Sequence, residues 1–417
     1  MSRNGTRSGS SLRSVFLFAL MLMAIFSRQS DAQDLQRRLR DSVDVWHKRN
    51  PATGLAVGVL HHGATVFAHG FGTRRLGFDS AVTTRTLFHM ASVSKQFTAT
   101  AVLQLVERGK VALDSPVTHY LPYFRLKDPR AARITVRQLL NHTSGLPDVT
   151  DYRWSHPETD SGALERFVRG LSDSVLVFAP GSDFQYSNIA FEVAADLVSK
   201  VSGMPFEDYE QQKILTPSGM KHSTFLMTDI DSANLAWPHA HNNKGVARAL
   251  GNYTYNRSHA GSGTLHSNVD DMLSWANVLL HGGQLNGKKV MNAATVNMMW
   301  ASTVDRTEQN NIQAYLNATP TPFDGYGYAL GWRWYRFGGR RLVGHSGQDD
   351  GFRVDILIAP HDSTAIVVLT NDLVGGPAEL SRILYKVTQA SDLLHRQAEL
   401  GHRNRRRPRS VVASHRD

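Results

Sequence analysis

Ser92 and Lys95 stand three positions apart at the start of a helical pattern. Residues with this spacing lie on one face of a helix, about one turn from each other. A lysine placed there can take the serine's proton if burial or nearby positive charge destabilises its ammonium form. A serine in the first turn also keeps a free backbone N–H, which suits an oxyanion hole. The pair therefore predicts a serine nucleophile with a lysine base.

Tyr186 and Asn188 form a second pattern, Tyr-x-Asn, just before another predicted helix. A phenol whose pKa is lowered by a neighbouring ammonium can carry a proton to a leaving group. The amide of Asn188 can hydrogen-bond both the substrate and the lysine. This segment therefore predicts the proton-transfer part of an acyl-transfer site.

Both patterns have a second match in the chain, and context decides between the copies. Ser218 and Lys221 repeat the first spacing, but Gly219 lies between them after a Thr-Pro pair, which indicates a turn. The second Tyr-x-Asn, at 315–317, lies in a polar segment that we expect to be a loop. We therefore favour Ser92 and Tyr186.

His345-Ser346-Gly347 is the third pattern, and it stands at the end of a predicted strand, followed by Gln348. A strand in this position can lie along a substrate and lend backbone amides to a developing oxyanion. Gly347 allows that backbone to approach closely. A Gly-x-Ser-x-Gly nucleophile elbow is excluded here, because Gln348 replaces the final Gly and the chain lacks βαβ alternation.

The three patterns in this order resemble those of the serine β-lactamases and penicillin-binding proteins. The similarity is greatest to the class C branch, which also contains esterases, D-aminopeptidases and D,D-carboxypeptidases. It extends over about residues 54–391 and includes Leu139–Leu146 and Gly344–Asn371.

This resemblance implies a role for each residue of the three patterns. Ser92 would be the acylated nucleophile, Lys95 its base and Tyr186 the proton shuttle, while Asn188 would orient Lys95 and the substrate. On the strand, His345 would replace the usual Lys, Ser346 and Gly347 would line the substrate, and the amides of Ser92 and Gln348 would form the oxyanion hole. No cofactor or metal is implied.

His345 is the departure from that family pattern. A lysine at this position attracts the substrate carboxylate of a β-lactam, and a neutral or partly charged histidine attracts it less. We therefore expect a serine hydrolase acting on esters or on D-amino-acid amides and peptides. A β-lactamase proper is the alternative within the family, and a non-catalytic protein that binds peptidoglycan or a partner is the alternative outside enzymes.

Composition and periodicity describe one large body with an α/β (α+β) fold. The chain has 417 residues, 41% of them hydrophobic, and no Cys, which excludes disulfides and thiol chemistry. We expect an antiparallel sheet built from both chain ends, with helices on it and a helical lobe inserted at about 110–260. Strands are predicted at 54–60, 64–71, 326–337, 341–344, 353–359 and 364–371, and helices at 34–48, 92–107, 135–141, 188–201, 205–215, 268–280, 293–300 and 377–391.

The two chain ends carry most of the net charge of +10. Residues 1–32 combine four Arg with an apolar stretch at 15–26 and small residues before Ala32, which is typical of a signal peptide cleaved after that residue. An uncleaved anchor is the alternative. We expect an exported, periplasmic or secreted protein with a body at 33–394, and no nucleic-acid partner. Residues 395–417 hold seven Arg and two acids, which predicts a disordered basic tail, with binding to the cell envelope as an alternative role.

Two histidine pairs, His61-His62 and His239-Ala240-His241, contain a common type of metal ligand. No carboxylate lies beside either pair in the sequence. We therefore expect solvated loop histidines and no metal site.

Overall fold

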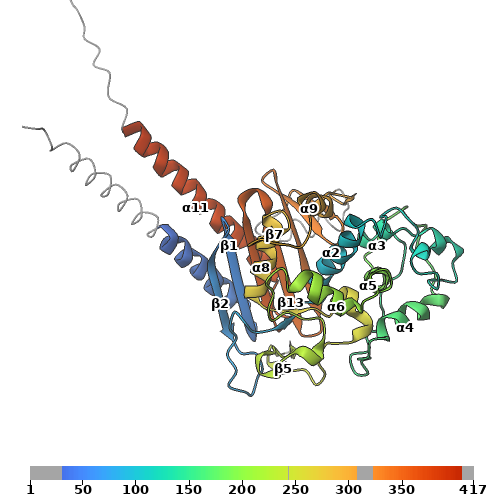
Figure 1. The fold of residues 1–417 in the computed structure, drawn as a ribbon. Helices are drawn as coiled ribbons and strands as arrows, with labels where there is room; N and C mark the ends of the chain where they lie inside the picture. The colour runs from blue at the N-terminus through green and yellow to red at the C-terminus, as the bar shows by residue number, and fades with distance from the viewer. Residues whose placement is uncertain (1–30, 243, 308–322, 406–417) are drawn as a thin grey trace, which may run out of the picture.

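An eight-stranded sheet forms the centre of the protein (Figure 1). The structure is a computed structural model that describes residues 31–242, 244–307 and 323–405. All neighbouring strands are antiparallel, in the order β2 (Ala64–Gly72), β1 (Gly54–His61), β14 (Thr364–Thr370), β13 (Phe352–Ala359), β12 (Arg340–Asp349), β11 (Arg333–Phe337), β10 (Gly325–Tyr328) and β9 (Val304–Asp305). The sheet joins both chain ends, as predicted.

Helices cover both faces of this sheet, so its central strands are apolar throughout. Side chains alternate between the two faces of a strand. In β1, Val57 and Val59 pack in the cluster that contains the helix over 31–49 and α11 (Pro377–Arg405). Ala56 and Leu60 belong to the other cluster, with α8 (Val269–Leu280).

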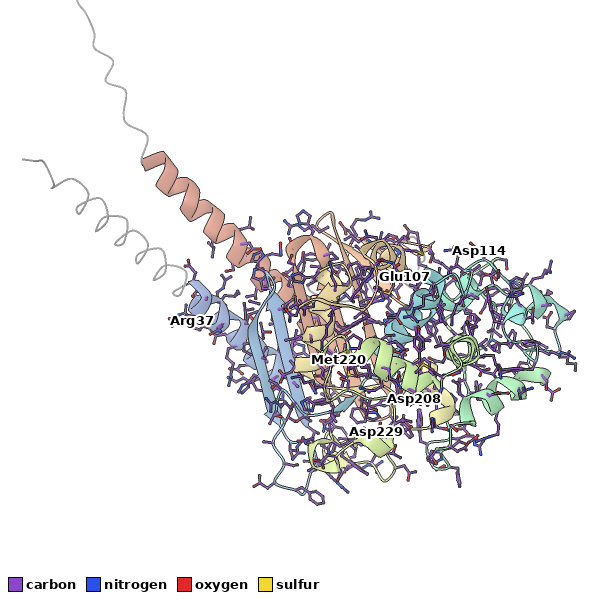
Figure 2. The ribbon with its side chains drawn as sticks, in the orientation of Figure 1. Arg37, Glu107, Asp114, Asp208, Met220 and Asp229 are labelled. Atoms are coloured by element: carbon purple, nitrogen blue, oxygen red, sulfur yellow. The ribbon has the colours of Figure 1, made fainter. Side chains whose placement is uncertain are left out.

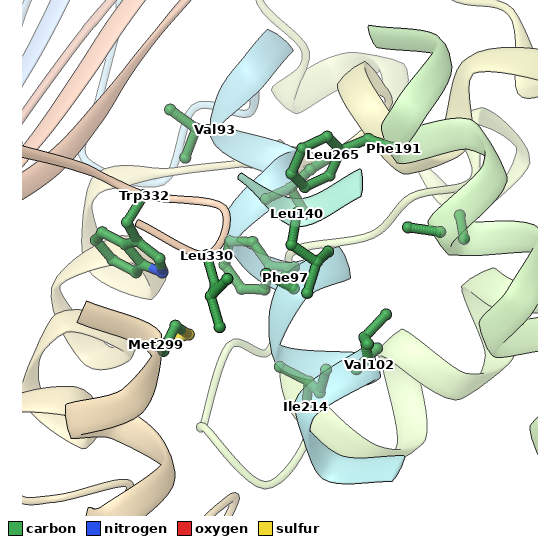
Figure 3. Close-up of a cluster of buried hydrophobic side chains, with 14 of the residues drawn as sticks. Val93, Phe97, Val102, Leu140, Phe191, Ile214, Leu265, Met299, Leu330 and Trp332 are labelled. Atoms are coloured by element: carbon green, nitrogen blue, oxygen red, sulfur yellow. The ribbon is translucent and has the colours of Figure 1, made fainter. Parts of the chain in front are cut away.

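The helical part of the protein is built around α2 (Ser94–Glu107), which is buried from Ser94 to Leu105. Figure 3 shows Phe97 of α2 among Leu140, Ile214 and Leu330. The surrounding helices are α3 (Val136–Leu140), α4 (Ala163–Arg169), α5 (Asn188–Ser202), α6 (Phe206–Glu210), α7 (Ala260–Gly263) and α9 (Ala293–Trp300). Three two-stranded pairs complete the fold: β3 (Phe88–His89) with β6 (His266–Ser267), β4 (His239–His241) with β5 (Ala247–Ala249), and β7 (Gln284–Leu285) with β8 (Lys288–Lys289).

Polar contacts fix the ends of the long helices. Glu107, labelled in Figure 2, accepts the backbone N–H of Asn292 at 2.6 Å and the hydroxyl of Thr295. This contact joins the end of α2 to the first turn of α9. At the N-terminus of α8, the side chain of Asn268 accepts a hydrogen bond from the backbone N–H of Asp271. Asn is one of the residues preferred at this capping position.

The segment predicted as one strand over 326–337 is instead a hairpin of β10 and β11. Gly331 has φ +74° in the connection, and a Cβ there would lie 2.5 Å from Cβ of Ala99 in α2. The chain thus turns where only glycine allows it to approach that helix. The strand predicted at 341–344 also extends further, to Asp349, so His345 lies within β12 and not at its end.

The closing helix also differs from its prediction. α11 continues through residues 395–405, which were expected to be part of a disordered tail. The sequence Gln-Ala-Glu-Leu at 397–400 has high helix propensity and no proline interrupts it, so the helix can propagate. The rest of the predicted tail, 406–417, and residues 1–30 of the predicted signal peptide lie outside the described residues. Within the described chain, no helix has the length and apolarity needed to span a membrane.

Candidate active site

Ser92 and Lys95 are in direct contact at the centre of the protein. Ser92 lies in a short 3₁₀ turn, η1 (Ala91–Val93), immediately before α2. Lys95 is fully buried, and its Nζ donates to Ser92 Oγ at 3.0 Å, to Asn188 Oδ1 at 2.5 Å and to the backbone oxygen of Ser262 at 3.0 Å. If Lys95 were neutral, its two hydrogens could still bond Asn188 and Ser262, and its lone pair would face the hydroxyl of Ser92. The geometry therefore suits proton transfer from Ser92.

Ala91 places the serine at a strained point of the backbone. Its φ is +45°, a left-handed conformation that residues with a side chain rarely adopt. Such strain costs about 1–3 kcal/mol and persists where the surrounding structure enforces it. Because Ser92 is the second residue of the turn, the turn's own hydrogen bonds do not use its N–H. The strain thus presents both the hydroxyl and the amide of Ser92.

Asn188 holds Lys95 from the first residue of α5. Its Nδ2 donates to Asp148 Oδ1 at 2.9 Å and to Tyr152 Oη at 2.6 Å, while its backbone N–H donates to the same Asp148 oxygen at 2.8 Å. Both amide hydrogens therefore have partners within the protein. This arrangement agrees with a role in orienting Lys95, and it leaves no hydrogen of Asn188 for a substrate amide. Asp148 and Tyr152 were not identified from the sequence, since neither belongs to a motif.

Glu192, one turn further along α5, holds the other acceptor of Lys95. This fully buried carboxylate accepts the N–H of Gly261 at 2.9 Å and the hydroxyl of Ser262. It thereby positions the Ser262 peptide whose oxygen faces Lys95. The sequence did contain a signal for this role, because Glu192 is a single Glu within an apolar helical segment. A carboxylate is rarely buried without partners.

Tyr186 lies beside Lys95 with its hydroxyl free. The ring centre is 5.0 Å from Lys95 Nζ, and the ring packs on His142 with centres 4.2 Å apart. Tyr186 Oη is buried and has no hydrogen-bond partner among the residues that the structure describes. A buried hydroxyl without a partner is uncommon in proteins and is available to an incoming group.

The second half of β12 forms one wall of the site. β11 ends its pairing at Arg333, opposite Gly344, whereas β13 pairs with β12 as far as Asp349. No strand of the described chain pairs with 345–349 on the β11 side, so sheet pairing does not use the backbone groups of that edge. A Cβ on Gly347 would lie 2.4 Å from the Met90 oxygen, so only glycine lets the strand lie against the turn that holds Ser92.

The side chains along this strand alternate in what they face. Ser346 donates from Oγ to Asp355 Oδ1 on β13 at 2.7 Å, away from the nucleophile, so Ser346 can offer a substrate only its backbone. Gln348 is exposed. His345, Gly347 and Asp349 lie on the other face of the strand, which lies against the turn that holds Ser92.

His345 is fully buried and neutral. Burial, followed by the positive charge of Arg333, holds the pKa of His345 well below its usual value. Its Nδ1 lies 2.7 Å from the Ser346 oxygen, to which it donates, so Nε2 accepts the hydroxyl hydrogen of Tyr328 at 2.9 Å. His345 therefore supplies no cation for a substrate carboxylate.

Asp349 lies at the other end of the unpaired edge of β12. Its Oδ2 is 2.8 Å from His89 Nε2 and 3.7 Å from the position of a Cβ on Gly263, the residue after Ser262. Burial and then the charge of Asp349 raise the pKa of Tyr152, whose Oη accepts from Asn188 Nδ2. The site thus has a carboxylate on the side opposite Tyr186 and His345.

Most of the chain matches the model of a known protein family. The beta-lactamase family model matches residues 35–390. The chain belongs to the beta-lactamase family.

Two curated relatives match most of this chain. Protein flp of Staphylococcus aureus (strain MW2) is 25% identical over 340 residues, and the unguisins hydrolase ungD' of Aspergillus campestris is 28% identical over 360 residues. Each match covers 81% of this chain but only 63% and 61% of those proteins, so the chain spans less than two thirds of their length.

Solved structures share the fold. A D-amino acid amidase from Ochrobactrum anthropi matches 87% of this chain and 99% of its own with a TM-score of 0.68 and 22% identity. The octameric penicillin-binding protein homologue of Pyrococcus abyssi has a TM-score of 0.67 at 24% identity, covering 84% of this chain and 76% of its own. EstCE1, a hydrolase with promiscuous acyltransferase activity, has a TM-score of 0.66 at 21% identity, covering 86% and 98%. At 21–24% identity, these three structures show that the chain shares their fold.

The other candidates from the sequence do not join this site. Ser218 and Lys221 lie around a turn in which Gly219 has φ +76°, and the motif at 315–317 falls outside the described residues. The histidine pairs, expected to be solvated loop residues without carboxylates, differ from that expectation. His61 and His239 are buried on strands, and the fold brings Asp392 to His61 and Asp372 to His241, at 3.0 and 3.2 Å.

Proposed function

We propose that this protein is a serine hydrolase that works through an acyl-enzyme on Ser92. The observation that carries the proposal is the buried Lys95, whose Nζ contacts Ser92 Oγ while Asn188 and Ser262 hold it in place. Lys95 in its neutral form takes the serine proton as Oγ forms a bond to the carbonyl carbon of the substrate. The N–H groups of Ser92 and Gln348 stabilise the resulting oxyanion.

Tyr186 completes the first half of the reaction. Its hydroxyl gives a proton to the leaving alcohol or amine as the bond from carbon to that group breaks, and it regains a proton from Lys95. A water molecule then attacks the acyl-serine, the same groups manage its proton, and the acid is released. The buried hydroxyl of Tyr186, which has no hydrogen-bond partner among the described residues, supports this assignment.

We propose esters and D-amino-acid amides or peptides as the substrate class. The neutral state of His345 disfavours a substrate that depends on a carboxylate, as β-lactams do. Since Tyr186 serves the leaving group, the acyl part of the substrate extends toward Asp349. A carboxylate there favours an acyl group that carries an ammonium, such as a free D-amino acid. Export of the protein remains a proposal that rests on residues 1–32.

Active-site labelling tests the proposal directly. Full-length protein is treated with a fluorophosphonate and, separately, with penicillin, and the modified residue is mapped by mass spectrometry. We expect label on Ser92, no label in Ser92→Ala, and normal labelling in Ser218→Ala. Absence of label on Ser92 with every reagent, together with no turnover of esters or D-alanine peptides, would instead support a non-catalytic binding protein. Rapid release of hydrolysed penicillin would identify a β-lactamase.

A further inference from the structure

A cluster of two imidazoles and one carboxylate lies away from the active site, where the β1–β2 hairpin meets α11. His61 Nε2 lies 3.0 Å from Asp392 Oδ1, and His62 Nε2 lies 3.2 Å from the same oxygen. One ligand atom from each of the three residues falls within 4.8 Å of the other two. The residues come from distant parts of the chain, and the fold alone brings them together.

The backbone at His62 directs both rings to one side. Successive side chains of a strand point to opposite faces, so His61 and His62 would normally diverge. His62 has φ +50°, in the left-handed region, and the two ring centres lie only 4.0 Å apart. Both rings therefore point to the same oxygen of Asp392.

Hydrogen bonding determines which nitrogen of His61 is free. The hydroxyl hydrogen of Thr364 is donated to the backbone oxygen of Asp362 at 3.0 Å, so Thr364 Oγ1 can only accept from His61 Nδ1, at 2.7 Å. In the neutral ring the proton is then on Nδ1, and Nε2 presents a lone pair to the carboxylate of Asp392. Two acceptors 3.0 Å apart repel each other unless a second proton or a metal cation lies between them.

We propose that His61, His62 and Asp392 form a zinc site that joins the β1–β2 hairpin to α11. Two imidazole nitrogens and a carboxylate oxygen are ligands that Zn²⁺ accepts, with a water at the fourth position. Metal–ligand bonds of about 2.0–2.2 Å at tetrahedral angles require ligand atoms about 3.3–3.5 Å apart. The observed 3.0 and 3.2 Å need an opening of a few tenths of an ångström, which the exposed ring of His62 can provide.

The surroundings match those of a metal ligand set. Thr364 fixes the tautomer and orientation of His61 through the nitrogen that does not face Asp392, as partners behind metal-binding histidines do. His239 offers a contrast within the same protein. Its Nε2 accepts the Leu76 N–H and its Nδ1 donates to the Asn371 oxygen, so both nitrogens are already used.

Zinc binding to tag-free, metal-stripped full-length protein tests the site. Isothermal titration with Zn²⁺ and visible absorption with Co²⁺ are recorded for the parent, His62→Ala, Asp392→Asn and the control His241→Ala. The control removes a histidine that pairs with the buried Asp372 and has no third ligand among the described residues. We expect one Zn²⁺ per chain for the parent and His241→Ala, and affinity at least tenfold lower for the two site variants. Zn²⁺ at 100 times the parent's Kd should raise the Tm of the parent by about 3 °C and that of Asp392→Asn by no more than about half as much.

Two outcomes would overturn the zinc site. One is the absence of stoichiometric binding by the parent, which would leave an imidazolium–carboxylate ion pair as the explanation of the cluster. The other is equal binding by the parent, His62→Ala and Asp392→Asn. Hydrolysis by Ser92 is measured in parallel and should not change with Zn²⁺, so this result is independent of the proposed catalytic function.

Discussion

Lys95 Nζ lies 3.0 Å from Ser92 Oγ in an environment that gives each hydrogen of the amine a fixed acceptor. The amine has no freedom to turn away from the serine, because Asn188 and Ser262 are themselves held by Asp148 and Glu192. Substitutions that break this contact therefore test the proposed site most directly.

Replacing Lys95 with Met should remove the base while keeping an unbranched side chain of similar length. We expect kcat/KM for ester hydrolysis to fall about 10²–10⁴-fold, since a positioned base contributes about that much. Lys221→Met, in the second Ser-x-x-Lys segment, is the matched control and should keep full activity. Activity is measured on protein whose folding is checked by circular dichroism. Equal activity of the two variants would exclude Lys95 as the base.

Tyr186→Phe should discriminate between leaving groups. The ring and its packing on His142 remain, and only the hydroxyl is lost. An amine must be protonated to leave, whereas a nitrophenolate need not be. We therefore expect kcat to fall far more for an amide than for a p-nitrophenyl ester, by about 10²–10⁴-fold for the amide. The same loss for both substrates would mean that Tyr186 acts on a step other than leaving-group departure.

Gly347→Ala should push β12 away from the nucleophile. The added methyl would meet the Met90 oxygen at 2.4 Å and Ala91 Cβ at 3.1 Å. Overpacking of this kind costs about 1–3 kcal/mol, and here it also displaces the oxyanion-binding strand. Urea unfolding and kcat/KM should both decline. Gly170→Ala, where φ is −71° and no atom lies within 4 Å, should leave both unchanged.

Asp349→Asn should change selectivity more than general activity. The comparison uses D-alanine p-nitroanilide and its N-acetyl derivative, which differ in the ammonium group. Loss of a charged partner should lower kcat/KM about tenfold for the free amine alone. The exposed neighbour Asp350 provides the control, as Asp350→Asn. If both substrates respond alike to Asp349→Asn, this carboxylate does not recognise the acyl ammonium.

Stability should fall on acidification below about pH 6.5. Burial holds the pKa of His142, His266 and His345 well below the usual value, so the folded protein keeps these rings neutral. The unfolded chain binds their protons near pH 6.5, so stability is complete above that pH and is lost as the pH decreases toward the folded-state values. Urea unfolding between pH 7.5 and 5 should show this slope.

A single substitution can assign part of that pH dependence. His266→Gln should reduce the slope by about 1.4 kcal/mol per pH unit, because it removes one proton that only the unfolded chain binds. His156→Gln, at an exposed position, is the control and should leave the slope as it is. An unchanged slope in His266→Gln would contradict the buried neutral state of that ring.

The sequence by itself determined the contacts that depend on neighbours along the chain. Ser92 and Lys95 meet because a helix places residues three apart on one face, and Tyr186 and Asn188 follow from the start of α5. Alternation and turn residues likewise predicted β1, β13 and β14 almost to the residue. These features need only local geometry and the burial of apolar side chains.

The tertiary structure decided everything that depends on groups far apart in the chain. Asp148 and Tyr152 hold Asn188, and Glu192 holds the Ser262 segment, only because loops and helices pack together. No spacing in the sequence records those contacts. The neutral state of His345 depends on burial and on Arg333 of the neighbouring strand. Asp392 meets His61 across more than three hundred residues for the same reason. Hydrogen bonds and burial of this kind are set by the three-dimensional neighbours of a group, which its sequence neighbours do not specify.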